Sequence, residues 1–437
     1  MVAVEKKAQR YDAYKDSGVE WLGEIPEHWE IKKLKLSIKK IIDNRGRTPI
    51  FGDIGTPMLE IRNITNGLKN PTEDFQKYVL PEIVVKYERD KVHIDDVLIS
   101  TVGATSGKVV IINKKPKYFI AQNVIGIRFT KMNNPLFMYF FLRSEYFISS
   151  LQLINKGNTI DNLKVSVFVN NICFFPPLPE QTKIAQFLDD KTTKIDDTIA
   201  IKQQQINLLK ERKQILIHKA VTRGLDDSVT LKDSGVEWIG EIPEHWDLLP
   251  GFMVYKENKT KNDGMKEDVV LSLSYGNIVI KPKEKLVGLV PESFETYQIV
   301  KPGDIIIRCM DLQNDKTSLR TGIAVNDGII TSAYLNLNII NNNVSAYVYN
   351  FLHALDTTKV LYKFGTGLRQ NLSFEDFKHL RIPIPPIHEQ EGIVIYIENI
   401  TQKIETAIGL KQQEIDKLKE YKSSLINGVV TGKVRVC

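Results

Sequence analysis

One 15-residue segment occurs twice in the chain, nearly unchanged. The segment "DSGVEWLGEIPEHWE" begins at Asp16, and "DSGVEWIGEIPEHWD" begins at Asp233, 217 residues later. Only two positions differ between the copies, whereas the sequences that follow them are dissimilar. We call residues 14–30 and 231–247 the tryptophan motifs, after the two tryptophans in each. A segment kept in both copies of an internal repeat while its surroundings diverge is typical of a structural element.

A second pair of matching segments indicates that the two halves of the chain repeat one another. "PPLPEQ" (residues 176–181) and "PPIHEQ" (residues 385–390) lie 209 residues apart, and a long polar stretch follows each. In both stretches apolar residues recur at alternating steps of three and four, the heptad pattern of helices that pack side by side. Each stretch therefore predicts a helix of about 38 residues, roughly 57 Å long. One small domain cannot bury such a helix, so we expect the two helices to pair, each keeping an outward face free for a partner protein.

The regions between these segments predict mixed helix and strand. Strand patterns rich in branched residues occur at residues 96–101 and 123–129, and again at 303–309 and 332–339. Short amphipathic helices are expected at residues 138–147 and 347–355. The expected fold class is α+β, with two globular mixed α/β domains related as a repeat and joined by two long helices. The expected parts are residues 1–178 (first globular domain), 179–224 (hinge and first long helix), 225–384 (second globular domain), 385–432 (hinge and second long helix) and 433–437 (tail).

Charge and cysteine content restrict the setting in which the chain functions. The net charge of +6 is compatible with an anionic partner, but it is too small for indiscriminate binding of nucleic acid. The three cysteines are isolated from one another and form no CxxC pair, so a reducing cytoplasm is expected. The first residues contain no apolar signal sequence, and no run of about 18 apolar residues predicts a membrane span. We therefore expect a cytoplasmic protein.

No catalytic motif is found. "VGATSGKVV" (residues 102–110) resembles a phosphate-binding loop, but its glycine and lysine are one residue too close, and valine replaces the hydroxyl residue that would hold magnesium. "HEQEG" (residues 388–392) is not HExxH, and the histidines and cysteines have no metal-ligand spacing. The nucleophile elbow of hydrolases and the glycine motif of dinucleotide-binding proteins are also missing. The sequence therefore predicts no enzyme active site, no metal and no cofactor.

Polar and basic residues cluster where both halves should form loops. Arginine, asparagine and glutamine can hydrogen-bond to base edges, while lysine, serine and threonine bind phosphates. Different loops on two copies of one scaffold therefore predict two DNA-binding surfaces with different specificity. The candidate DNA-binding residues are Arg45, Arg47, Arg62, Asn63, Thr105, Ser106, Lys108, Gln122 and Asn123 in the first half, and Tyr275, Asn277, Lys281, Lys283, Arg308, Gln313, Lys316 and Arg320 in the second.

With these motifs, and with "GNTIDNL" (residues 157–163) and "GTGLRQNL" (residues 365–372) ahead of each hinge, the chain resembles the specificity subunit of type I restriction–modification systems over nearly its whole length. The resemblance implies two target-recognition domains, each binding half of a bipartite, asymmetric DNA target in the major groove. It also implies that the two helices are antiparallel, set the spacer between the half-sites and dock two adenine methyltransferase subunits, to which restriction subunits add. Methylation and cleavage then belong to the partners, so the chain itself is not an enzyme. The apolar residues assigned to the docking helices are Leu188, Ile195, Ile199, Ile206, Leu209, Leu216, Ile404, Ile408, Ile415, Leu418 and Leu425.

Two other functions fit the sequence. A single-chain DNA-modification enzyme would methylate DNA without partners when given S-adenosylmethionine. A pseudo-dimeric transcription regulator would bind an operator tightly and would not co-purify with a methyltransferase. If the helices set the spacer, inserting four residues near Gln204, about 6 Å of helix, should lengthen it by a base pair or two.

Overall fold

The chain forms two compact units, each made from two separate stretches of sequence. Unit 1 comprises Met1–Lys202 and Gln413–Cys437, and unit 2 comprises Gln203–Gln412. Each unit is treated by itself below. In the computed structural model, the described residues are 9–44, 51–65, 67–80, 82, 84–85, 91–102, 107–120, 123–154, 163–282, 284, 293–310, 319–364 and 371–437.

Unit 1 contains a four-stranded antiparallel sheet in the order β4-β11-β8-β9. Its strands are β4 (Ile38–Ile42), β11 (Val124–Phe129), β8 (Val97–Ser100) and β9 (Val109–Ile111). A second sheet has the order β10-β6-β7-β5, and two two-stranded sheets pair β1 with β2 and β3 with β12. The remaining elements are β1 (Tyr14–Asp16), β2 (Glu24–Pro26), β3 (Glu30–Lys33), β5 (Phe51–Gly52), β6 (Thr56–Leu59), β7 (Tyr78–Val79), β10 (Phe119–Ile120), β12 (Ile172–Phe175), α2 (Pro135–Leu142), α3 (Glu145–Ile154), α4 (Val165–Val169) and the 3-10 helices η1 (Leu34–Ser37) and η2 (Ile61–Asn63).

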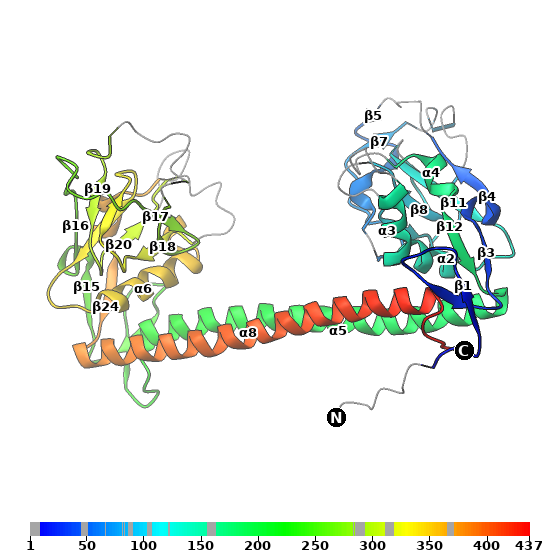
Figure 1. The fold of residues 1–437 in the computed structure, drawn as a ribbon. Coiled ribbons are helices and arrows are strands. Elements are labelled where there is room, and N and C mark those ends of the chain that lie inside the picture. The colour runs from blue at the N-terminus through cyan, green and yellow to red at the C-terminus, as the bar shows by residue number, and fades with distance from the viewer. Residues whose placement is uncertain are drawn as a thin grey trace. The chain divides into compact units, whose positions relative to one another are not determined.

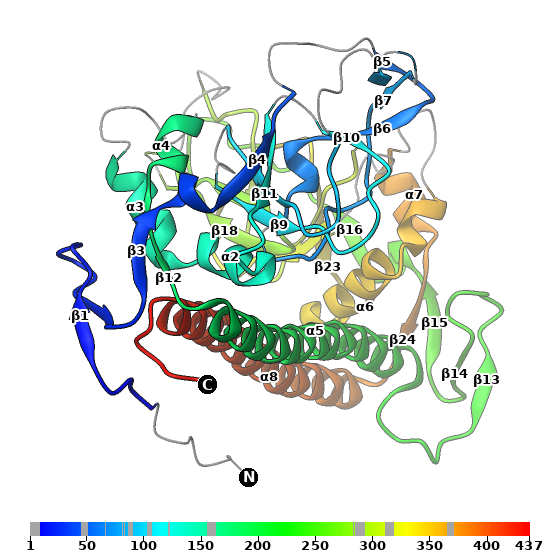
Figure 2. The same ribbon diagram turned by 90° about the vertical axis from the view of Figure 1, so that its right-hand side faces the viewer.

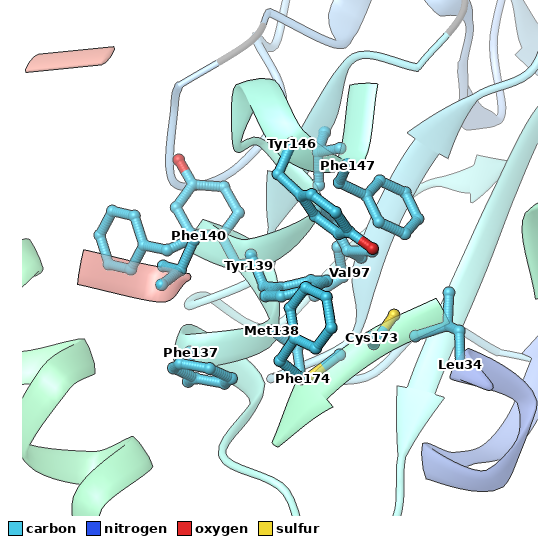
Figure 3. Packing of buried hydrophobic residues seen from close by; sticks show 14 of the residues in the cluster. Leu34, Val97, Phe137, Met138, Tyr139, Phe140, Tyr146, Phe147, Cys173 and Phe174 are labelled. Carbon is cyan, nitrogen blue, oxygen red and sulfur yellow. The ribbon is translucent and has the colours of Figure 1, made fainter. Parts of the chain in front are cut away.

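The core of unit 1 is built around α2, which is apolar on all sides. Residues 137–142 of this helix are all at most 1% exposed, as expected for a helix that is buried all round. Figure 3 shows how residues 137–140 pack with neighbouring aromatic side chains, among them Tyr146 and Phe174, whose ring centroids are 4.9 Å apart. The same cluster includes Ile99 from β8 and Leu188 from a long helix, so α2 lies between the sheet and that helix.

The single helix expected at residues 138–147 is wrong, because α2 ends at Leu142 and α3 begins at Glu145. Ser144 lies in the break. Its hydroxyl donates to the carbonyl of Phe141 at 2.7 Å and accepts from the backbone N–H of Phe147 at 3.2 Å. A serine that hydrogen-bonds to nearby backbone in this way competes with the helix and caps the next one.

Unit 2 contains a second copy of the four-stranded sheet of unit 1, surrounded by different strands and loops. Its four-stranded antiparallel sheet has the order β16-β23-β20-β21, from β16 (Tyr255–Glu257), β23 (Leu335–Ile339), β20 (Ile305–Ile307) and β21 (Thr321–Ile323). The strands predicted at residues 303–309 and 332–339 are therefore confirmed. The other elements are β13 (Leu231–Asp233), β14 (Glu241–Pro243), β15 (Asp247–Pro250), β17 (Leu271–Ser274), β18 (Asn277–Ile280), β19 (Gln298–Val300), β22 (Gly328–Ile330), β24 (Arg381–Ile384), α6 (Ser345–Thr357), α7 (Phe374–Lys378), η4 (Gly251–Met253) and η6 (Val360–Lys363).

Two long helices pack together as an antiparallel pair, α5 (Leu178–Arg223, 46 residues) and α8 (Ile387–Val430, 44 residues). Both are longer than the heptad pattern suggested, because each begins immediately after its proline pair. In unit 1 Lys422 Nζ lies 2.6 Å from Asp196 Oδ2, and in unit 2 Lys213 Nζ lies 3.0 Å from Glu405 Oε1. These two ion pairs are copies of each other, since both residues shift by 209 positions. The helices lie side by side in both views (Figures 1 and 2), and the predicted pairing is confirmed.

The tryptophan motif fixes the start of one long helix in each unit. In unit 1 the indole Nε1 of Trp29, which is 0% exposed, donates to Glu180 Oε1 in the first turn of α5 at 3.1 Å, and His28 Nε2 lies 2.8 Å from Glu180 Oε2. In unit 2 Trp246 Nε1 donates to Glu389 Oε2 in the first turn of α8 at 3.0 Å, and His245 takes the place of His28. The motif is therefore retained because it holds a helix end.

The same motif also contacts the end of the other long helix. Gly432 follows α8 in the left-handed conformation (φ +73°), and a Cβ there would lie 2.2 Å from Pro26 Cδ and 3.4 Å from the Trp29 ring. In unit 2 Gly224 follows α5 with φ +74°, and its Cβ would lie 3.1 Å from the ring of Trp246. Each motif thus packs against the first turn of one helix and the last turn of the other.

We expect Gly432→Ala to destabilise unit 1 by about 2–4 kcal/mol, since alanine is strained at positive φ and its methyl group overlaps Pro26. Gly18→Ala is the matched control, because Gly18 has φ +71° and nothing within 4 Å of its Cβ position. That variant should lose only the backbone cost of about 1–2 kcal/mol. Denaturant unfolding of the two variants measures the difference, and equal losses would show that the contact between Gly432 and Pro26 is unimportant.

Candidate nucleic-acid interface

Of the seventeen candidate DNA-binding residues, eight fall outside the described part of the chain. They are Arg45, Arg47, Thr105, Ser106, Gln122, Lys283, Gln313 and Lys316. The other nine are placed by the structure, and they divide into residues that face solvent and residues that hold a loop.

In unit 1 two candidates lie at one edge of the sheet β4-β11-β8-β9. Val124 at the start of β11 pairs with Ser100 at the end of β8, and β9 begins beside that same end. Asn123 directly precedes β11 and is exposed, and Lys108 directly precedes β9 and is half-buried. An amide that can hydrogen-bond to bases and an ammonium group that can bind phosphate therefore come together at this edge.

Arg62 and Asn63 lie in η2, and their environments differ. The side chain of Arg62 is half-exposed, with Nε 3.3 Å from Glu60 Oε2. Asn63 is 1% exposed, and its amide donates to the carbonyls of Thr72 and Asp74, both at 3.0 Å. Asn63 therefore fixes the backbone of this loop, and its side chain does not face solvent.

In unit 2 candidates also lie at the corresponding edge of the repeated sheet. Arg308 directly follows β20 and is exposed. Tyr275 and Asn277 lie at the turn of the hairpin of β17 and β18, which packs on the start of β21, since a Cβ on Gly322 would lie 3.0 Å from Ile278 Cδ1. Lys281 follows β18 at the other end of the hairpin, where its backbone N–H donates to the carbonyl of Val270 at 2.8 Å. Each unit thus presents candidate residues at the corresponding edge of its own copy of the sheet.

Arg320 is 3% exposed and holds the connection between β20 and β21. Its guanidinium Nη1 donates to the carbonyls of Met310 at 2.6 Å and Arg308 at 3.2 Å. Its backbone N–H donates to Asp356 Oδ2 at 2.6 Å.

Burial raises the pKa of Asp356, while hydrogen bonds from the backbone N–H groups of Arg320 and Thr321 oppose that rise. Burial also lowers the pKa of His353 to about 4, so this imidazole, 3.1 Å from the hydroxyl of Thr321, is neutral at pH 7.

Of the eleven residues assigned to the docking helices, Leu188 belongs to the core of unit 1 and Leu425 packs against that core, while the others form the seam within the helix pair. All eleven are buried or half-buried: Leu188, Ile195, Ile199, Ile206, Leu209, Leu216, Ile404, Ile408, Ile415, Leu418 and Leu425. The fully buried residues among them, such as Leu188, Ile206 and Ile415, are not accessible to a partner. In unit 2 the outward face of α5 carries Leu208 (55% exposed) and Ile215 (60% exposed), one heptad apart. The repeat places the exposed residues Lys417 and Ser424 at the equivalent positions of α8 in unit 1.

The glutamine of each proline hinge has a structural role that the sequence did not predict. Gln181 donates to the carbonyl of Pro176 at 2.9 Å and accepts from the backbone N–H of Asn134 at 2.8 Å. Gln390 donates to the carbonyl of Pro385 at 2.9 Å and accepts from the backbone N–H of Val344 at 2.9 Å. Both copies of the hinge contain this glutamine, and that repetition was the only sign of its role in the sequence.

Glu180→Ala should destabilise unit 1 by about 1–3 kcal/mol, because it leaves the buried indole N–H of Trp29 without an acceptor. Asp190→Ala, at an exposed position of the same helix, is the control and should be close to neutral. Thermal unfolding of both variants would reveal the difference; an unchanged Glu180→Ala midpoint would mean that the tryptophan contact contributes little.

The described residues contain neither a metal site nor a membrane span. No group of three or more histidine, cysteine, aspartate or glutamate side chains is placed to hold a metal ion. No helix there has the length and apolar content needed to cross a membrane.

Comparison with known proteins gives the family. The family described as "Type I restriction modification DNA specificity domain" matches residues 26–211 and again residues 251–419. The chain belongs to this family. The two matches correspond to the two halves of the repeat, and the resemblance seen in the motifs is confirmed.

Named relatives of this specificity-domain family align over nearly the whole chain. The putative type I restriction enzyme MjaX specificity subunit of Methanocaldococcus jannaschii is 24% identical, covering 95% of this chain and 96% of the relative. The MjaVIII specificity subunit of the same organism is 23% identical, with 94% of each chain covered.

Solved structures share the fold. A chain from a study of complex assembly and conformational transition of the type I R-M system has a TM-score of 0.68 at 13% identity, covering 94% of this chain and 99% of that chain. The HsdS subunit from Thermoanaerobacter tengcongensis has a TM-score of 0.51 at 14% identity, covering 94% and 98%.

Proposed function

We propose that this chain is the DNA-recognition subunit of a type I restriction–modification complex, in which each unit binds one half of a bipartite, asymmetric DNA target. The observation that carries the proposal is the repeated sheet whose corresponding edges bear different side chains. Unit 1 presents Asn123 and Lys108 there, whereas unit 2 presents Arg308 and the hairpin of β17 and β18. One scaffold with two different binding edges suits a target with two different halves.

The chemistry of these edges fits double-stranded DNA. Asparagine can pair with adenine and arginine with guanine through two hydrogen bonds each in the major groove, and lysine binds phosphate. The net charge of +6 supplies few phosphate contacts, so the lone chain should bind DNA weakly. Full affinity then requires partner subunits that neutralise further phosphates.

The partners we propose are two adenine methyltransferase subunits, one on the outward face of the helix pair in each unit, with restriction subunits joining through them. The relatives are named as specificity subunits of type I restriction enzymes, and this chain aligns with them nearly end to end. The exposed Leu208 and Ile215 favour such a contact, because apolar residues one heptad apart on an exposed helix face suit a protein partner. The chain itself is a specificity subunit and not an enzyme; methylation and cleavage take place on its partners.

The proposal is tested by mapping methylated adenines in DNA from cells that express this chain together with its neighbouring methyltransferase. We expect two short, dissimilar half-sites separated by a spacer of constant length. Neither protein expressed alone should produce this pattern. A continuous or symmetric target would contradict the bipartite recognition, and specific high-affinity binding by the lone chain would favour a pseudo-dimeric regulator instead.

A further inference from the structure

The hairpin of β17 and β18 in unit 2 ends in an unusual turn. Ser274 pairs with Asn277, so the loop consists of the two residues Tyr275 and Gly276. Both have positive φ, +47° and +78°, as a type I′ turn requires. The first position of such a turn favours asparagine, aspartate or glycine, and a bulky aromatic residue is sterically disfavoured there. The conformation of Tyr275 is therefore unfavourable for its side chain.

Of the other six non-glycine residues at positive φ in the described chain, four are asparagine or aspartate and two, Met265 and Lys359, are not. Asparagine tolerates positive φ well. Tyr275 is the aromatic residue among those at positive φ. When the backbone holds a poorly suited residue, the cost is often retained for a function of the side chain.

The tyrosine ring contributes no contact to the fold. Tyr275 is 81% exposed, the largest exposure among the aromatic side chains identified as exposed. Within the described residues, its hydroxyl makes no hydrogen bond and its ring forms no aromatic or cation contact, while only its carbonyl accepts a bond, from the Asn277 amide at 3.2 Å. An exposed ring at the tip of a short hairpin is therefore free to contact a ligand.

The side chains around Tyr275 are suited to base edges. The register of the hairpin places Ser272, Ser274, Asn277 and Val279 on one face, and the alternate residue Ile278 is buried in the core. Hydroxyl and amide groups can hydrogen-bond to bases, and Val279, 42% exposed, can contact a thymine methyl group. The tip lies beside Leu319, whose Cβ would be 3.5 Å from a Cβ on Gly276, close to the edge that also bears Arg308.

We propose that Tyr275 inserts its ring against the bases of the half-site bound by unit 2 and partly unstacks them, while the neighbouring serine and asparagine side chains hydrogen-bond to base edges. This inference rests on the proposed DNA-recognition function. The ring, and not the hydroxyl, makes the contact, because base stacking needs only an aromatic face. Apolar and aromatic side chains that enter a base step displace the stack and open the duplex locally.

The test uses the complex of the full chain with its methyltransferase and a duplex that carries the mapped target. Binding of Tyr275→Phe should equal that of the unaltered chain, whereas Tyr275→Asn should bind about ten- to a hundred-fold more weakly through loss of stacking. The same Tyr275→Asn change should raise the melting temperature of the chain by about 2–4 °C, because asparagine suits the turn. A side chain that served only the fold could not give these opposite effects.

Met265→Asn is the matched control, since Met265 is also an exposed apolar residue of unit 2 at positive φ, +55°. It precedes β17, at the end of the strand away from the turn, so its replacement should leave DNA affinity unchanged. The purine positions of each half-site are replaced in turn by 2-aminopurine, whose fluorescence rises when it unstacks. We expect a rise at one or two neighbouring positions with tyrosine or phenylalanine at position 275, and none with asparagine.

The outcomes separate this inference from the proposed function. If the unaltered complex prefers its mapped target but Tyr275→Asn binds equally well, or binds weakly without any loss of fluorescence, the insertion is wrong and the recognition function stands. If Tyr275→Asn lowers the melting temperature, the ring is structural and the inference is also wrong. If the unaltered complex does not prefer the mapped target, the recognition function itself fails.

Discussion

Inserting seven residues into both long helices, after Gln204 in α5 and after Gln413 in α8, should lengthen the spacer of the DNA target by about three base pairs. Seven helical residues add about 10.5 Å at 1.5 Å each, and base pairs are spaced about 3.4 Å apart. The two insertion points are copies of each other at the repeat offset of 209. Because seven residues are one heptad, Ile195 and Ile206 of α5 keep their places in the seam, as do the matching residues of α8.

Mapping of methylated adenines measures this effect. We expect methylation at every original site to be lost and to reappear at sites with the same half-sites and the longer spacer. Insertion of four residues near Gln204 alone is the comparison. It adds about 6 Å of helix and should lengthen the spacer by only a base pair or two. An unchanged spacer in the matched double insertion would show that the helices do not set it.

Introducing glutamate at two outward positions, Leu208→Glu with Ile215→Glu, should reduce the number of bound methyltransferase subunits from two to one. Both side chains are more than half exposed, so the helix pair itself should remain folded. If the two residues lie in a protein contact, each charge must be buried against the partner without a counter-charge. A loss of about 2 kcal/mol or more of binding free energy at each of the two positions would together weaken methyltransferase binding by roughly a hundred- to a thousand-fold.

The matched control is Lys417→Glu with Ser424→Glu, at the equivalent positions of α8 in unit 1. These positions carry no apolar side chain, so this variant should reduce methyltransferase binding less than Leu208→Glu with Ile215→Glu does. Native mass spectrometry of the co-expressed complex reports the stoichiometry, and thermal unfolding of each variant shows whether the chain has remained folded. Two methyltransferases still bound to Leu208→Glu with Ile215→Glu would place the docking surface elsewhere.

The sequence was sufficient for the architecture because the architecture depends on periodic and repeated features. Heptad residues such as Ile206 and Ile415 predicted the helix pair, and the repeat predicted two copies of one sheet. The break between α2 and α3 was missed, since Ser144 interrupts an otherwise apolar segment through hydrogen bonds that no periodicity reveals. The structural roles of Asn63 and Arg320 were also hidden, because a polar residue that supports a loop and one that faces a ligand have the same composition. Their burial distinguishes them.

The duplicated contacts in the two halves of the chain have a consequence for the symmetry of its target. The pairing of Trp29 with Glu180 recurs as that of Trp246 with Glu389, and the ion pair of Asp196 with Lys422 recurs as that of Glu405 with Lys213. The tryptophan contact lies within each half and the ion pair joins the two halves, as expected for two identical half-length chains in a symmetric dimer. Such a dimer could recognise only a palindrome. In one polypeptide that contains both copies, each copy can accumulate its own mutations, so the chain can recognise a target with a direction.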